Sequence, residues 1–121
     1  LQTLLPSARR VTIHVGGEDV IVSADCASSV ALVVNELVQN ALKYAFPSGQ
    51  AGRIGIELHS GRPLCQLTVW DNGVGFQADR PRPGGAGLEL ASTIVREKLT
   101  GEWSVESGPG GTRISFDFLE Q

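Results

Sequence analysis

The chain has 121 residues, of which 41% are hydrophobic and 19% are charged, a balance typical of one compact globular domain and a length too short for two. Its net charge of −3 and its pI of about 5.3 argue against a dedicated nucleic-acid surface, which would be basic. No apolar run approaches the roughly 20 residues that cross a bilayer, and no signal peptide is visible.

The cysteines and the first residues suggest the context of the domain. Cys26 and Cys65 lack metal-ligand spacing, and we expect both to be reduced core residues of a cytoplasmic protein. The sequence contains no methionine and begins at Leu1, so we expect a piece of a longer chain, which could be membrane-anchored. Residues 1–10 are interpreted as a linker or the end of a preceding helix, and residues 11–121 as a single domain.

The first half of the chain predicts two strands and a long helix. Residues 11–15 alternate between apolar and polar side chains, which indicates a strand. Residues 16–17 supply a glycine turn, and residues 20–22 predict a returning strand. Apolar residues then recur at the three-four spacing of a helix over residues 30–45. Three residues could cap its start: Asp25, Ser28 and Ser29.

The second half alternates less regularly. Further strands are predicted over residues 54–58 and 67–71, followed by a proline- and glycine-rich loop over residues 77–87. A second helix is expected over residues 88–99, and two final strands occupy residues 102–119 around a glycine-rich turn. Because strands and helices occur in blocks, we expect a mixed, largely antiparallel sheet with helices on one face, an α/β two-layer sandwich.

Three polar residues share one face of the long helix. Glu36, Asn40 and Lys43 fall within roughly 60° of one another at about 100° per residue, away from the centre of the apolar stripe. An amide oxygen suits Mg²⁺, and an amine one turn away suits phosphate oxygens. A solvated face with a weak side-chain network explains the same pattern.

Alternation along two strands directs further polar side chains inward. Asp71 shares a strand face with Leu67 and Val69, so its carboxylate should meet the edge of the core, where it needs a donor such as an adenine amino group. Thr112 shares a face with the apolar residues of the last strand. The alternatives are a hairpin turn at Asn72-Gly73 and a threonine that satisfies itself at a strand start.

A glycine cluster, Gly84-Gly85-Ala86-Gly87, precedes the second helix. Free N–H groups at a helix start attract anions, and glycines allow a backbone to approach phosphate closely. An ordinary flexible loop accounts equally well for the cluster taken alone.

Taken together, these segments resemble the histidine-kinase branch of the gyrase, heat-shock chaperone, histidine kinase and MutL ATPase superfamily. Residues 35–44 (NELVQNALKY) resemble its N box, and residues 71–76 (DNGVGF) its first glycine box. Residues 85–88 (GAGL) resemble the second glycine box, and Gly111-Thr112 the terminal Gly-Thr element. The resemblance implies the Bergerat sandwich and an ATP-binding catalytic domain that uses ATP and Mg²⁺.

The resemblance also implies roles for individual residues. Asn40 would ligate Mg²⁺, Asp71 would accept a hydrogen bond from the adenine amino group, and Lys43 and Tyr44 would contact phosphates or ribose. Gly73 and Gly75 would line the adenine end, and Gly85 and Gly87 would close over the phosphates. Thr112 could hold a water beside the base. Glu36 could act as a base or support the metal ligand, and Glu89 replaces the last glycine of the fuller lid motif.

In kinases of this type, ATP phosphorylates a histidine on a separate dimerisation domain. A response regulator is the indirect partner, reached through that domain. His14 and His59 are both expected in strands, so the resemblance places the acceptor histidine outside this sequence. We expect the isolated domain to be monomeric. Two alternatives remain: an anti-sigma switch that phosphorylates a serine, and an ATP-hydrolysing conformational clamp that uses Glu36 as its base.

Overall fold

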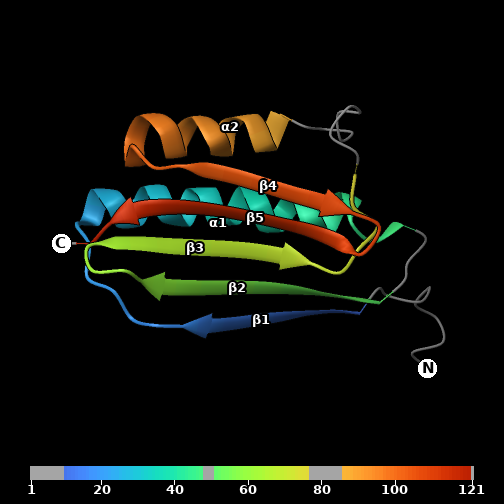
Figure 1. Cartoon of the computed structure of the whole chain (residues 1–121). Coiled ribbons are helices and arrows are strands. Elements are labelled where there is room, and N and C mark those ends of the chain that lie inside the picture. Colours follow the sequence, from blue (N-terminus) through green and yellow to red (C-terminus); the bar gives the residue numbers. More distant parts are fainter. Residues whose placement is uncertain (1–9, 48–50, 77–85, 121) are drawn as a thin grey trace, which may run out of the picture.

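The structure is a computed structural model that describes residues 10–47, 51–76 and 86–120. A five-stranded sheet has the order β1-β2-β3-β5-β4. Its strands are β1 (Val11–Gly17), β2 (Gly52–Ser60), β3 (Leu64–Asp71), β4 (Trp103–Gly108) and β5 (Gly111–Leu119). The helices α1 (Ala24–Tyr44) and α2 (Ala86–Ile94) lie on one face of the sheet (Figure 1). The predicted two-layer sandwich is therefore confirmed.

The segment between β1 and α1 corrects one prediction. β1 pairs with β2 in parallel, whereas the other neighbouring strands pair antiparallel. The returning strand expected over residues 20–22 is wrong, because residues 18–23 contain no strand. Glu18 donates its N–H to the Leu58 carbonyl at 2.8 Å, and Ile21 donates its N–H to the Glu120 carboxylate at 3.3 Å. The segment is thus tied to β2 and to the end of the chain, and β1 pairs with β2.

The long helix starts earlier than its predicted caps. α1 begins after Ser23, whose Oγ accepts the Cys26 N–H at 3.1 Å. The three expected capping residues therefore lie inside the helix: Asp25, Ser28 and Ser29. The second helix is confirmed but irregular, because α2 continues directly into a π-helical turn, η3 (Val95–Leu99).

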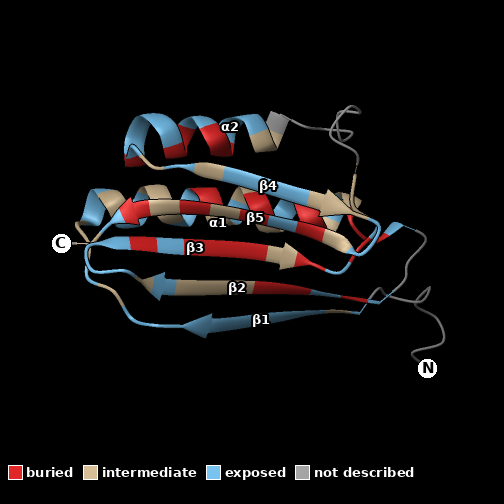
Figure 2. Cartoon of the chain, in the orientation of Figure 1, coloured by how far each residue is buried: buried red, intermediate tan, exposed pale blue. Residues whose placement is uncertain are grey.

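The core lies between the central strands and the two helices. Figure 2 shows buried residues concentrated on β3 and β5 and exposed residues along β1. On β1 the apolar Ile13 and Val15 remain 48% and 74% exposed, so this edge strand lies outside the main core. In the described ranges, 10–47, 51–76 and 86–120, no helix is both long and apolar enough to cross a membrane.

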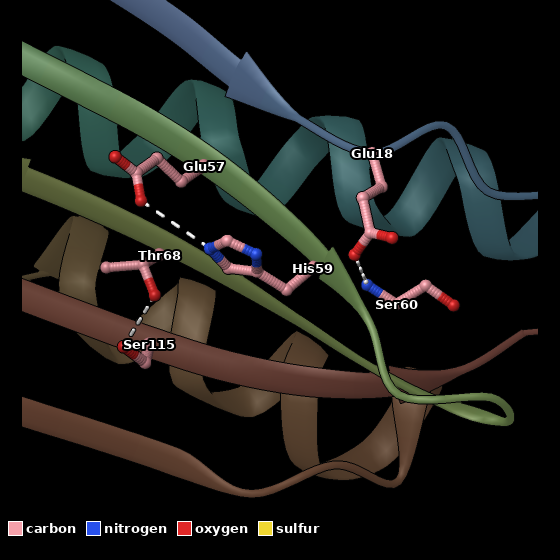
Figure 3. Close-up of polar contacts among 6 residues, drawn as sticks. All are labelled: Glu18, Glu57, His59, Ser60, Thr68 and Ser115. Atoms are coloured by element: carbon pink, nitrogen blue, oxygen red, sulfur yellow. Dashed lines mark hydrogen bonds and ion pairs between the residues drawn. The ribbon is translucent and has the colours of Figure 1, made fainter.

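The sheet face away from the helices carries polar side-chain pairs. Thr68 and Ser115 share a hydrogen bond of 3.0 Å between their hydroxyls, and His59 Nε2 lies 3.5 Å from Glu57 Oε1 (Figure 3). His59 is on β2 and His14 is on β1, and both are exposed. Their predicted placement in strands is therefore confirmed.

The end of the sheet where β3 begins is held together by Glu120. Its carboxylate accepts the Ser60 hydroxyl at 2.7 Å as well as the Ile21 N–H. The Ser60 hydrogen bond, followed by that from Ile21, lowers the pKa of Glu120. Cys65 is buried nearby, and burial raises the pKa of its thiol. Cys65 and the half-buried Cys26 are both free cysteines, as expected.

Candidate functional site

The polar face of α1 is more enclosed than its sequence suggested. Asn40 is only 5% exposed, Glu36 and Tyr44 are half-buried, and Lys43 is exposed in the last turn. Asn40 is buried beside the apolar stripe of the helix because α2 starts against it. A methyl group added at Gly87 would lie 3.1 Å from Glu36 Oε2 and 3.8 Å from Asn40 Nδ2.

The close approach of Gly87 brings two predicted parts of the site together. Gly87 is the second residue of α2, so the amino end of that helix lies directly beside Glu36 and Asn40. A helix amino end carries partial positive charge and favours anions such as phosphate. A carboxylate and an amide therefore lie next to a region suited to phosphate. Gly85, predicted beside Gly87, lies outside the described residues, as does most of the predicted loop over residues 77–87.

The ends of β3 and β5 present buried polar side chains toward the helices. Asp71 and Thr112 are cross-strand partners, 8% and 4% exposed. They continue the inward face formed by Val69 and Ile114, as strand alternation predicts. Asp71 Oδ1 accepts the Gly73 N–H at 2.9 Å. One oxygen of this carboxylate therefore helps to fix the loop that follows β3.

Ser107 is a polar residue at this site that sequence reasoning missed. It is the cross-strand partner of Thr112 on β4, and the two hydroxyl oxygens are 2.8 Å apart. Its Oγ also accepts the Phe76 N–H at 2.8 Å. Counting inward positions back from Thr112 across the Gly108–Gly111 turn would have identified it, because hairpin partners share one face of a sheet.

The loop after Asp71 is wedged between α1 and the β4–β5 hairpin, which meet at the same end of the molecule (Figure 1). Val74 donates its N–H to the Ala45 carbonyl at 2.9 Å, and a methyl at Gly73 would overlap that carbonyl. Gly75 has a φ of 70° and lies against the Gly108 carbonyl. The alternative of a hairpin turn at Asn72-Gly73 is excluded, because Val74 bonds to the end of α1 and the chain does not return as a strand.

Two cavities lie along β4. One, of about 520 Å³, surrounds the β4–β5 turn and is lined by Asp71, Thr112 and Ser107 as well as by Trp70, Glu106 and Arg113, which alternate onto the other sheet face. The other, of about 350 Å³, lies between α2 and β4 and is lined by apolar groups including Phe76 and Leu88, with Ser107 at its border. Ser107 is thus the residue that lines both cavities.

Comparison with known proteins decides the family. Residues 26–121 match the family model described as histidine kinase-, DNA gyrase B- and HSP90-like ATPase. The chain belongs to this ATPase family. The resemblance to the ATP-binding domains of histidine kinases is therefore confirmed, together with their Bergerat sandwich.

Two kinases resemble the chain over most of its length. The blue-light-activated histidine kinase 2 of Erythrobacter litoralis is 31% identical over 112 residues, covering 88% of this chain and 32% of that protein. The chain thus spans about a third of that relative. The serine-protein kinase RsbW of Listeria innocua is 28% identical over 89 residues, covering 60% of this chain and 57% of RsbW.

A solved structure gives the same result for the fold of this ATPase domain. The histidine kinase domain of the Erythrobacter litoralis EL346 blue-light-activated kinase matches with a TM-score of 0.79 and 26% identity. The match covers 89% of this chain and 54% of that one.

Proposed function

We propose that this ATPase domain binds Mg·ATP and donates the γ-phosphoryl group to a histidine on a separate dimerisation domain in two-component signalling. The observation that supports this most is the packing of the start of α2 against Glu36 and Asn40. It puts a carboxylate, an amide and a helix amino end together at one place. At the same end of the molecule, Asp71 and Thr112 form a buried polar pair.

Asp71 and Thr112 are proposed to bind the purine. Asp71 would accept a hydrogen bond from the adenine amino group through its buried carboxylate. Thr112 would hold a water beside the base. Gly73 and Gly75, which keep the loop flush with α1 and the hairpin, would line the adenine.

Asn40 is proposed to ligate Mg²⁺ through its side-chain oxygen. The buried amide fits, because Mg²⁺ takes few protein ligands and fills its sphere with phosphate and water oxygens. In the described part of the chain no group of three or more His, Cys, Asp and Glu side chains gathers as a metal site. When bound, the ion neutralises charge on the phosphates. Lys43 and Tyr44 would contact phosphates or ribose, and Gly85 and Gly87 would close over the phosphates.

Glu36 and the acceptor define the chemistry. Glu36 would act as a base for the attacking group or orient Asn40, which its position beside Gly87 permits. His14 and His59 are exposed residues of β1 and β2, at the opposite side of the sheet order from β4. The acceptor is therefore proposed on a partner domain of the parent chain. We further propose that residues 11–121 form one catalytic domain that is monomeric and cytoplasmic. Its indirect partner would be a response regulator, reached through the dimerisation domain.

Phosphotransfer tests the proposed function. The chain is incubated with γ-labelled ATP and a histidine-bearing helical dimerisation domain, and acid-labile label on that domain is measured. Asn40→Ala should abolish transfer and alter its Mg²⁺ dependence more than its preference for adenine. Failure of the wild-type chain to bind Mg·ATP would refute the function. Rapid ATP hydrolysis without an acceptor, lost in Glu36→Gln, would instead establish the conformational clamp.

A serine acceptor is the second candidate, because the similarity to RsbW covers 60% of the chain. In that function the same pocket would phosphorylate a serine on an antagonist protein. Serine and histidine phosphates differ in acid stability, so the same labelling experiment separates them. Acid-stable label on a serine-bearing partner would establish the switch and exclude the histidine kinase.

A further inference from the structure

Ser107 connects the loop after β3 to the strand that carries Thr112. Its hydroxyl oxygen accepts the Phe76 N–H at 2.8 Å and lies 2.8 Å from Thr112 Oγ1. A hydroxyl has one hydrogen to donate and two positions at which it accepts. Because Phe76 occupies one accepting position, two arrangements remain for the pair: Ser107 donates to Thr112, or Thr112 donates to Ser107. The direction in which the Thr112 hydroxyl points is thus coupled to Ser107.

The backbones around Ser107 are closely interlocked. Gly75 packs against the Gly108 carbonyl on one side of the loop. On the other side Gly111, with a φ of 131°, packs against the Asp71 carbonyl. In both places a methyl group would overlap main-chain atoms. The loop and the hairpin therefore have one relative position, and Ser107 adds a side-chain bond at the point where they meet.

Ser107 also lines both cavities along β4. It lines the polar cavity with Asp71 and Thr112, and it borders the apolar cavity between α2 and β4 with Phe76. Its hydroxyl contacts both the Thr112 hydroxyl and the loop that contains Phe76.

We propose that Ser107 is a positioning residue that makes the site select adenine over guanine, by holding the Phe76 amide and orienting the Thr112 hydroxyl. The inference rests on the proposed function. Adenine presents an amino donor where guanine presents a carbonyl acceptor. The N1 atom of adenine accepts a hydrogen bond, whereas the N1–H of guanine donates one. A hydroxyl held in one orientation discriminates between these edges, whereas a freely rotating hydroxyl adapts to both.

The test compares Mg·ATP and Mg·GTP binding to the chain by calorimetry. In Ser107→Ala the ATP affinity should fall roughly five- to tenfold, the effect of one lost hydrogen bond, with a change in GTP affinity within about twofold. Ser107→Thr keeps the hydroxyl and should restore most of the preference for ATP. Ser104→Ala removes an exposed hydroxyl from the opposite face of β4 and should change neither affinity.

The outcomes separate this inference from the proposed function. If the wild-type chain binds ATP and Ser107→Ala keeps the ATP-to-GTP ratio, the inference is overturned and the function stands. Equal weakening of both nucleotides with a lower Tm would show a purely structural role and overturn it too. Should Ser107→Ala not fold, Ser107→Cys, which retains only a weak donor, must show the reduced ratio. A wild-type chain that binds no ATP overturns both proposals.

Discussion

The two ends of the sheet use carboxylates in different ways. At the end where β3 begins, Glu120 reaches across loops to bind the Ser60 hydroxyl and the Ile21 N–H, and Glu18 accepts the Ser60 N–H at 2.8 Å. At the other end, the buried Asp71 sits in a row with Thr112, beside cavities. Where β3 begins, the long side chains of Glu18 and Glu120 hold neighbouring segments together through hydrogen bonds. At the other end, which we call the ligand end because ATP is proposed to bind there, the short side chain of Asp71 lies where glycines allow the backbones to pack closely.

Gly111→Ala should disturb the ligand end most. The added methyl would overlap the Asp71 carbonyl, and alanine would be strained at a φ of 131°. We expect the free energy of unfolding to fall by about 2–4 kcal/mol, measured by urea denaturation. Gly110→Ala is the matched control, because a methyl there meets no atom within 4 Å. Equal stability of the two variants would show that the hairpin does not depend on close backbone packing.

Asp71→Asn tests whether the buried carboxylate serves a ligand. The amide oxygen can still accept the Gly73 N–H, so the fold should persist. Loss of a charge-assisted hydrogen bond should weaken ATP binding by about 1–3 kcal/mol, measured by calorimetry. The far-end control is Asp19→Asn at an exposed position, which should leave binding unchanged. Near-wild-type affinity in Asp71→Asn would remove the contrast between the two ends.

Strand alternation predicted the ligand end well. The parity of Leu67, Val69 and Asp71 predicted an inward carboxylate, and the structure buries all three. The same reasoning predicted the burial of Thr112. These predictions succeeded because a strand repeats every two residues and one face of this sheet is covered by helices.

Contacts between distant segments could not be predicted in this way. The burial of Asn40 depends on where α2 packs, which helical periodicity within α1 does not contain. Residues 20–22 have the composition of a strand, but they form none, and Ile21 donates its N–H to the remote Glu120 carboxylate. The position of Ser107 beside Thr112 depends on the register of the last hairpin. Each of these was set by tertiary contacts rather than by local pattern.

Gly87→Ala should separate stability from binding at the ligand end. Alanine favours helix over glycine, so α2 should gain about 0.5 kcal/mol of stability. The new methyl would lie 3.1 Å from Glu36 Oε2 and should weaken Mg·ATP binding by about 1 kcal/mol through crowding. Thermal unfolding and calorimetry measure the two effects. If crowding is the cause, the penalty disappears when Glu36→Ala is the background of the same substitution.

Glu120→Gln should have the smallest effect and confine it to stability. Because the pKa of folded Glu120 is lowered from 4.5, its contribution is complete above that value and is lost as pH falls toward the folded pKa. The variant should therefore lose some stability near neutral pH and show a shallower decline in acid, measured by urea denaturation across pH. Ser60→Ala removes the largest cause of the shift and should act in the same direction. The double variant should add little to either change, and ATP affinity should not move. A change in ATP affinity would mean that the two ends are coupled, since Glu120 lies at the opposite end of the sheet from Asp71.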